Sequence, residues 1–277
     1  MTARNPRRLE TVLDCRRAFQ QIARECLVEL RHREAAARRG DAEAIHRMRI
    51  ALTKLRSARK FFAAMTRDAG WPGLKREIRW LNAALGAARD SDVAAGQSKA
   101  MSIRSAPATR EIVSRHVTHS HRRLTRALHS KRYHRFAAAL ARWIEAGPWV
   151  TEPAAAARQR RMRPLADHGR RQLARWKKRL SQKADRLSNE KQRHRLRIEA
   201  KRFRYMSEAL KRLGVPESGG QASARKAAAR VQNALGDLRD IRRFRRKYAR
   251  RHPDRRSDRR RKKKLLREAT KALRRLA

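Results

Sequence analysis

The sequence HRLRIEAKRFRY at residues 194–205 has a counterpart 148 positions earlier, HRMRIALTKLR at residues 46–56. Both stretches begin His-Arg-x-Arg-Ile and continue with basic residues at helical spacing. An α-helix has about 3.6 residues per turn, so positions i, i+3, i+7 and i+10 lie along one face. The pattern predicts two helices that each carry one stripe of mostly basic residues. These stripes are His46, Arg49, Thr53 and Arg56 in the first helix, and His194, Arg197, Lys201 and Arg204 in the second.

Each stretch also carries an apolar stripe, displaced by one position from the basic one. Its members are Ile45, Met48, Leu52 and Leu55 in the first helix, and Leu196, Ala200, Phe203 and Leu210 in the second. One residue turns an α-helix by about 100°, so each basic stripe borders the core instead of lying opposite it. We therefore expect a neighbouring helix to enclose the basic residues in a groove. A solvated face is the simplest alternative, and the repetition of the pattern argues against it.

The composition indicates an all-α protein that binds a polyanion. The 277 residues include 76 Lys and Arg against 25 Asp and Glu, a formal net charge of +51. Such an excess opposes folding through self-repulsion and favours a nucleic acid, an anionic membrane surface or a free inorganic polyanion as partner. Aromatic residues make up only 5% of the chain, and helix-favouring Ala, Leu and Arg are frequent. This amino-acid composition predicts helices throughout the chain.

The expected location is the cytoplasm. No run of about 18 apolar residues is present to span a bilayer, and residues 1–10 have no apolar segment typical of an export signal. Cys15 and Cys26 are too far apart along one predicted helix to form a disulfide with each other. Reduced cysteines are usual in the cytoplasm.

Helical spacing and chain breakers predict the order of the elements. Proline and glycine cluster most strongly at residues 147–153. The expected helices cover 9–38, 42–67, 74–85, 108–143, 154–186, 190–213 and 221–240, with a closing basic helix within 242–277.

A second motif, Leu-Gly-x-x-Arg-Asp, closes the predicted helices at Leu85–Asp90 and Leu235–Asp240, an offset of 150. Two landmarks repeated in the same order indicate a duplicated helical unit. We expect one domain over residues 9–277, built from two repeats (about 9–147 and about 154–277), after a short disordered basic segment at 1–8.

The two motif pairs resemble the signatures of the CHAD domain, the conserved histidine α-helical domain, over nearly the whole chain. The resemblance implies two four-helix bundles related by a pseudo-twofold axis, with a basic central groove or cavity that binds inorganic polyphosphate. Association with polyphosphate granules is a further implication. The ligand-facing residues that it implies are His46, Arg49, Lys54, Arg56, His194, Arg197, Lys201, Arg202 and Arg204. Thr53 stands where the family usually has a basic residue, so the first half is expected to contribute less charge.

Polyphosphate also suits the residues on physical grounds. The polymer carries roughly one negative charge per phosphate and has no bases, so dense charge and forked donors suffice to bind it. A nearby polyanion favours protonated histidine, and we therefore expect affinity to rise as the pH falls below neutral. His46 and His194 could alternatively be core residues that orient a neighbouring helix by hydrogen bonding.

Two other functions fit the charge. A nucleic-acid-binding protein is one, although no zinc-finger, helix-turn-helix or RNP pattern is present and few aromatic residues accompany the basic runs. A phosphatase or phosphotransferase acting on phosphate chains is the other, and it needs carboxylates or an activated nucleophile in the groove. Only Asp90 and Asp240 occupy equivalent positions, and Arg89-Asp90 and Arg239-Asp240 fit local salt bridges or helix caps better.

We therefore expect a non-catalytic protein with no cofactor, whose partners are polyphosphate and, through charge alone, non-specific nucleic acid. No metal site is assigned. His116, His119 and His121 share helical spacing, but no cysteine or carboxylate lies close to them in the sequence.

Overall fold

The structure is a computed structural model that describes residues 13–100, 107–183, 187, 189–217, 219–248 and 255–276. These residues are helical apart from the connections and one isolated β-bridge between Asp14 and Pro164. The all-α prediction is confirmed. In chain order the helices are α1 (Cys15–Arg38), α2 (Ala42–Phe61), α3 (Trp71–Ala100), α4 (Pro107–His129), α5 (Lys131–Ala146), α6 (Pro148–Thr151), α7 (Ala155–Met162), α8 (Leu165–Ser181), α9 (Glu190–Arg212), α10 (Gln221–Tyr248) and α11 (Arg255–Arg274).

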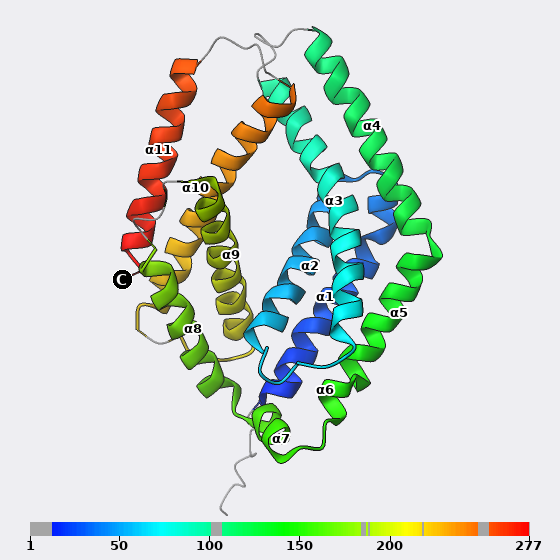
Figure 1. Ribbon diagram of the computed structural model, residues 1–277, viewed down its shortest axis with the longest axis vertical. Coiled ribbons are helices and arrows are strands. Elements are labelled where there is room, and N and C mark those ends of the chain that lie inside the picture. Colours follow the sequence, from blue (N-terminus) through cyan, green and yellow to red (C-terminus); the bar gives the residue numbers. More distant parts are fainter. Residues whose placement is uncertain are drawn as a thin grey trace, which may run out of the picture.

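The helices pack in two groups that meet along α2 and α9. Figure 1 shows α1 to α5 on one side and α8 to α11 on the other, with α6 and α7 at one end between them. Within the groups α1 packs on α2, α3 on α4, α9 on α10 and α10 on α11, and α2 contacts α9 across the middle. One hydrophobic cluster runs through both groups. The two motif helices are therefore neighbours.

Capping residues set the ends of the motif helices as predicted. Asp41 caps α2 by accepting a hydrogen bond from the backbone N–H of Ala44, and Asn189 caps α9 by accepting one from Gln192. Gly214 follows the end of α9 with φ +78°, a conformation that only glycine adopts without strain. These residues set where the two helices begin and where α9 ends.

The predicted apolar stripes of both motif helices are buried. Ile45, Met48, Leu52 and Leu55 on α2, and Leu196, Ala200, Phe203 and Leu210 on α9, are at most 1% exposed. The closing basic helix is α11, whose Leu265, Ala269 and Leu273 are buried. Cys15 and Cys26 are buried and unpaired. Within the described residues no helix is long and apolar enough to cross a membrane.

The prediction that two helices close in the Leu-Gly-x-x-Arg-Asp motif is wrong, because α3 and α10 continue through it. Gly86 and Gly236 were interpreted as helix ends. In the structure they are helical positions crossed by arginines: a Cβ atom would lie 3.8 Å from a terminal nitrogen of Arg49 at Gly86 and 3.4 Å from Nε of Arg197 at Gly236. At both positions an arginine of the motif helix thus packs against the glycine, at distances that are ordinary van der Waals contacts for an added Cβ atom.

Three further boundaries also differ from the prediction. α2 ends at Phe61 instead of 67, because Phe61 and Phe62 are both buried in the core and the chain turns there. The expected helix over 154–186 is interrupted at Pro164, whose missing N–H and fixed φ separate α7 from α8. The 147–153 boundary contains the single turn α6. The expected disordered segment 1–8 lies outside the described residues.

Candidate functional site

Three cations from the two motif helices converge where α2 meets α9. Arg49, Arg197 and Lys201 are each only partly exposed. The pKa of Lys201 is lowered from 10.5 to about 7, first by burial and then by the neighbouring charges of Arg197, Arg49, Arg204 and Arg239 in that order. Water and counter-charge are thus scarce around this ammonium group. The basic stripes of both halves face a common region.

Two aspartates from the second motif lie beside these cations. Asp90 on α3 is 3.7 Å from Arg49 and 2.5 Å from Arg243, measured between carboxylate oxygen and guanidinium nitrogen. Burial raises the pKa of Asp240 on α10, while Arg197 and Arg239 act in the opposite direction. These contacts join different helices. The interpretation of Asp90 and Asp240 as helix caps is therefore wrong, since both lie inside helices, and the ion pairs of Asp90 are made with other helices and not within its own motif.

Several donors at this junction lack hydrogen-bond partners. The Nε atoms of Arg197 and Arg204 are buried, and neither donates a hydrogen bond within the described structure. Arg204 instead places its guanidinium 4.8 Å from the centre of the Tyr205 ring and 3.6 Å from Glu208. A buried N–H without an acceptor is costly, at about 1–3 kcal/mol, so these atoms favour an oxyanion that can approach them.

The two motif histidines lie at the border of the cluster. Burial lowers the pKa of half-buried His46, with Arg89 as the next cause and a smaller contribution from Lys201. Burial and then Arg239 lower the pKa of His194, which is exposed. Neither ring forms a hydrogen bond to a described residue. In the unliganded protein both rings are therefore neutral at pH 7 and become charged only when the pH falls or an anion approaches.

The remaining predicted residues lie at two other places. Exposed Arg56 on α2 and half-buried Arg202 on α9 neighbour each other, and each has its pKa lowered, first by burial and then by another arginine, Arg79 for Arg56 and Arg56 for Arg202. Lys54 lines a separate cavity of about 330 Å³ between α1, α2 and α9, close to Glu25 and Glu29. The structure thus brings His46, Arg49, His194 and Arg197 together with Lys201 and Arg204. Lys54 lies apart from this group.

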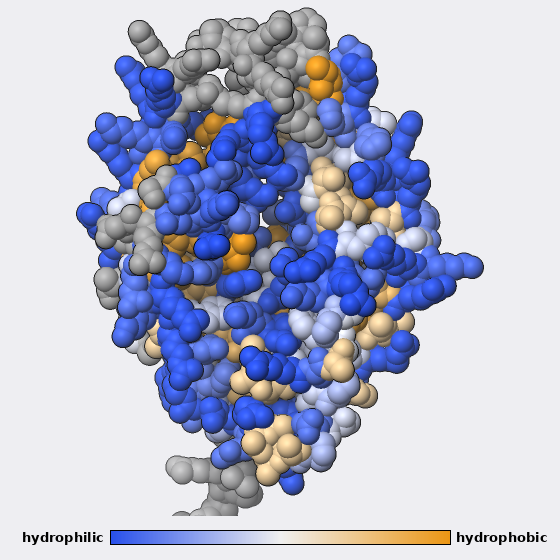
Figure 2. Space-filling model, viewed as in Figure 1, coloured by the Kyte–Doolittle hydropathy of each residue, from blue (hydrophilic) through white to orange (hydrophobic). Residues whose placement is uncertain are grey.

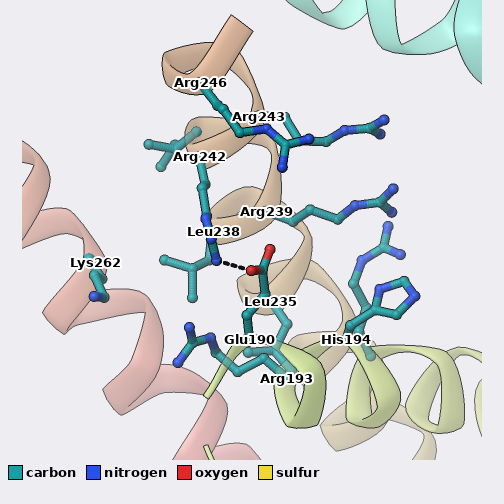
Figure 3. A pocket seen from close by; sticks show the side chains of 12 residues that line it. Glu190, Arg193, His194, Leu235, Leu238, Arg239, Arg242, Arg243, Arg246 and Lys262 are labelled. Atoms are coloured by element: carbon teal, nitrogen blue, oxygen red, sulfur yellow. Dashed lines mark ion pairs between the residues drawn. The ribbon is translucent and has the colours of Figure 1, made fainter. Parts of the chain in front are cut away.

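Sequence reasoning missed a large group of site residues on α10. Arg239, Arg242, Arg243 and Arg246 follow one another at helical spacing and line a cavity of about 500 Å³ with α9 and α11 (Figure 3). Arg239 was assigned to a local salt bridge within its motif. The signal that would have found the group was available: the motif helix continues in basic residues at i, i+3, i+4 and i+7 from Arg239.

The surface around the junction is strongly hydrophilic. Figure 2 shows a mostly hydrophilic face that is hollowed near its centre, with apolar side chains visible beside the hollow on the α9–α11 side. The hydrophilic side chains and the hollow occupy the region where the two helix groups of Figure 1 meet.

Among the three clustered histidines, His121 has a carboxylate partner that the sequence did not reveal. Its Nε2 atom lies 2.7 Å from Oδ1 of Asp92, which is on α3, 29 positions earlier. Helix packing brings this partner in, and sequence proximity therefore carried no information about it. Within the described residues, no group of three or more His, Cys, Asp or Glu side chains is placed to hold a metal ion.

The comparisons with known proteins agree with this architecture. A family model of the CHAD domain matches residues 21–248. The chain belongs to the CHAD domain family. Its structure is similar to the crystal structure of the CHAD domain from the plant Ricinus communis, with a TM-score of 0.75 and 25% sequence identity over 96% of this chain and 93% of that one. Among curated proteins, none matches.

Proposed function

We propose that this CHAD-domain protein binds inorganic polyphosphate without catalysis, in a basic groove between the two motif helices. The observation that carries the proposal is the convergence of Arg49, Arg197 and Lys201, with buried N–H groups that have no acceptor. A phosphate chain supplies closely spaced oxyanions and no other recognition feature. Forked guanidinium donors, and a lysine whose protonated form a nearby anion favours, match closely spaced oxyanions.

The proposed groove is the product of a duplication. The sequence offsets of 148 and 150 support it, and so does a shared geometric detail. In each half an arginine of the first motif crosses a glycine of the second: Arg49 over Gly86 and Arg197 over Gly236. A pseudo-twofold relation between repeats at about 9–147 and about 154–277 would place the two stripes face to face, as the α2–α9 contact requires. The groove is then one site built from both halves.

Nucleic acid is the competing partner, and one feature disfavours it at this site. Single-stranded binders stack bases on aromatic side chains. The large hydrophobic residues that are exposed in the described structure are Val28, Ile112 and Met162, none of them aromatic, and Tyr205 is buried. On the exposed surface, nucleic acid would therefore be held by charge, for example by the basic face of α11 at Arg260, Lys263, Lys264 and Arg267.

Catalysis on phosphate chains is also disfavoured by the surroundings of the carboxylates. Asp90 is engaged by Arg49 and Arg243, and Glu199 by Lys183 at 2.7 Å. Both carboxylates are thus engaged by cationic side chains of the protein itself. If Asp90→Asn with Asp240→Asn removed a phosphate-releasing activity of the wild-type protein, the non-catalytic proposal would be wrong.

A competition titration tests the choice of partner. Labelled long-chain polyphosphate is displaced by single-stranded RNA, duplex DNA or short phosphates at about 150 mM salt, where screening is substantial. We expect polyphosphate to bind at least about tenfold more tightly per charge, and Arg197→Ala with Arg204→Ala to abolish that margin. Equal competition by nucleic acid, with the double variant unchanged, would contradict the proposal. Binding at polyphosphate granules in the cytoplasm is the corresponding cellular proposal.

A further inference from the structure

The cavity between α9, α10 and α11 has an apolar strip that a bare phosphate chain does not need. Leu235, Leu238 and Ile241 line it from α10 at positions i, i+3 and i+6, and Leu235 is 3% exposed. The strip spans about 9 Å along the helix. A phosphate next to such a surface loses hydration without gaining an acceptor or donor, so the strip favours an apolar ligand group.

The rest of the lining is cationic. The labelled side chains in Figure 3 place Arg193, Arg242, Arg246 and Lys262 around the strip, with Arg239 and His194 on the side nearest the motif helices. Glu190 is the one carboxylate among the described lining residues, and it forms an ion pair with Arg242. One end of the cavity is thus apolar, and the other joins the basic cluster through Arg197 and Arg239.

The corresponding place in the first half is filled. At an offset of 150, Ile241 and Arg242 correspond to Ser91 and Asp92. Ser91 hydrogen-bonds Ser120 at 2.6 Å and Asp92 bonds His121 at 2.7 Å, which join α3 directly to α4. The cavity is therefore a feature of the second half and does not follow from the duplicated motif.

We propose that this cavity binds the base of a nucleoside polyphosphate, whose phosphates extend into the cluster at Arg197 and Arg239. A purine is flat and short enough for the strip at Leu238 and Ile241, and guanidinium planes such as Arg246 stack on bases. The cavity volume of about 500 Å³ is that of a small-molecule site. A lipid acyl chain would need a longer apolar path. The phosphate half of the proposal rests on the proposed function, and the base half does not.

The test compares ligands that share a triphosphate and differ in the base. ATP and tripolyphosphate are titrated against the wild-type full chain by calorimetry, with dodecyl phosphate as the lipid-like arm. We expect ATP to bind about tenfold more tightly than tripolyphosphate, the gain typical of one stacked base. Equal affinities for ATP and tripolyphosphate would overturn the proposal, and so would dodecyl phosphate matching ATP.

Two variants locate the effect. Leu238→Ser should weaken ATP binding by about fivefold or more and leave tripolyphosphate and long-chain polyphosphate unchanged. Leu213→Ser, which removes a half-buried leucine of the same half outside this cavity, is the matched control and should change none of the three. An equal loss of ATP affinity in both variants would overturn the proposal. Failure of the proposed function would look different, because long-chain polyphosphate would then not bind the wild-type protein in preference to nucleic acid.

Discussion

Arg49 and Arg197 occupy equivalent positions in the two halves, yet their surroundings differ. Arg49 donates a hydrogen bond of 3.4 Å to the carbonyl of Gly86 and lies 3.7 Å from Asp90. Arg197 lies over Gly236 but has its Nε buried without an acceptor. The same motif arginine is therefore hydrogen-bonded and close to a carboxylate in the first half, and it keeps a buried donor without an acceptor in the second.

The third position of the basic stripes shows the same asymmetry. In the first half it is Thr53, whose hydroxyl donates a hydrogen bond of 2.8 Å to the carbonyl of Arg49 and therefore has its partner within α2. In the second half it is Lys201, whose pKa is lowered to about 7. Asp90 of the first half also pairs with Arg243 of the second. Cationic charge that could contact a ligand is thus concentrated on α9 and α10.

The largest expected effect separates the two arginines. Arg197→Ala should weaken polyphosphate binding by about 10- to 100-fold, since a charge-assisted hydrogen bond contributes roughly 1.5–3 kcal/mol. Arg49→Ala should weaken it less, because Arg49 is already partly neutralised by Asp90. Fluorescence anisotropy with labelled polyphosphate measures both. Arg195→Ala removes an exposed arginine of the same helix and is the control. Equal losses for Arg49 and Arg197 would contradict the asymmetry.

The next effect is a pH dependence that originates in α9. Lys201 has a pKa of about 7 in the unliganded protein, and a bound polyanion raises it. Binding then takes up a proton above pH 7, so affinity should fall by about tenfold between pH 6 and pH 8. His46 and His194 have lowered pKa values and should add to affinity only below their ordinary range near 6.5. Titrations at constant ionic strength give the profile.

Lys201→Met provides the control for that profile. The variant should bind polyphosphate equally between pH 6.5 and 8. Its stability gives a second readout, because the folded state lowers the lysine pKa and the unfolded chain binds more protons between about 7 and 10.5. The free energy of unfolding of the wild type should therefore rise with pH in that window, and the variant should lack this component. A pH profile of binding that survives in Lys201→Met would assign the effect to other groups.

A smaller effect should run in the opposite direction. Asp90→Asn removes the carboxylate shared by Arg49 and Arg243 and should strengthen polyphosphate binding by about three- to fivefold. Urea denaturation should show a lower free energy of unfolding, because the two guanidinium groups then repel without compensation. Glu77→Gln, which removes a carboxylate paired with Arg132 on the exposed surface, is a matched control for the loss of one negative charge. Weaker polyphosphate binding by Asp90→Asn would show that Asp90 contributes to the site in another way.

The smallest expected effect comes from restoring the basic residue in the first half. Thr53→Lys should strengthen binding by about two- to threefold at low salt and by less at high salt, as a partly screened charge would. Competition titrations at two salt concentrations measure it. Thr53→Val, which also removes the hydroxyl, distinguishes the added charge from the loss of the hydrogen bond to Arg49. A gain of similar size in Thr53→Val would mean that charge at this position is irrelevant.

Periodicity and caps made much of this fold predictable. The spacing of Leu52 and Phe203 located the buried faces, and Asp41 and Asn189 located the helix starts, because both signals are local. Local signals failed at Gly86 and Gly236, which resemble helix ends but lie within α3 and α10, each packed against an arginine of another helix. They also missed the site role of Arg239, which depends on how α10 packs beside α9.

The sequence by itself determined an all-α chain and two similar basic stripes, and it led us to expect an anionic partner, since these inferences follow from helical period and net charge. The tertiary structure decided which of the cations meet. Packing of α2 against α9 brought Arg49 close to Arg197 and Lys201, whereas Lys54 lies in a separate cavity. The Nε atom of Arg197 has no acceptor, whereas Arg49 lies beside the carboxylate of Asp90. Such asymmetry arises from contacts between residues far apart in the chain, on which a repeated local pattern carries no information.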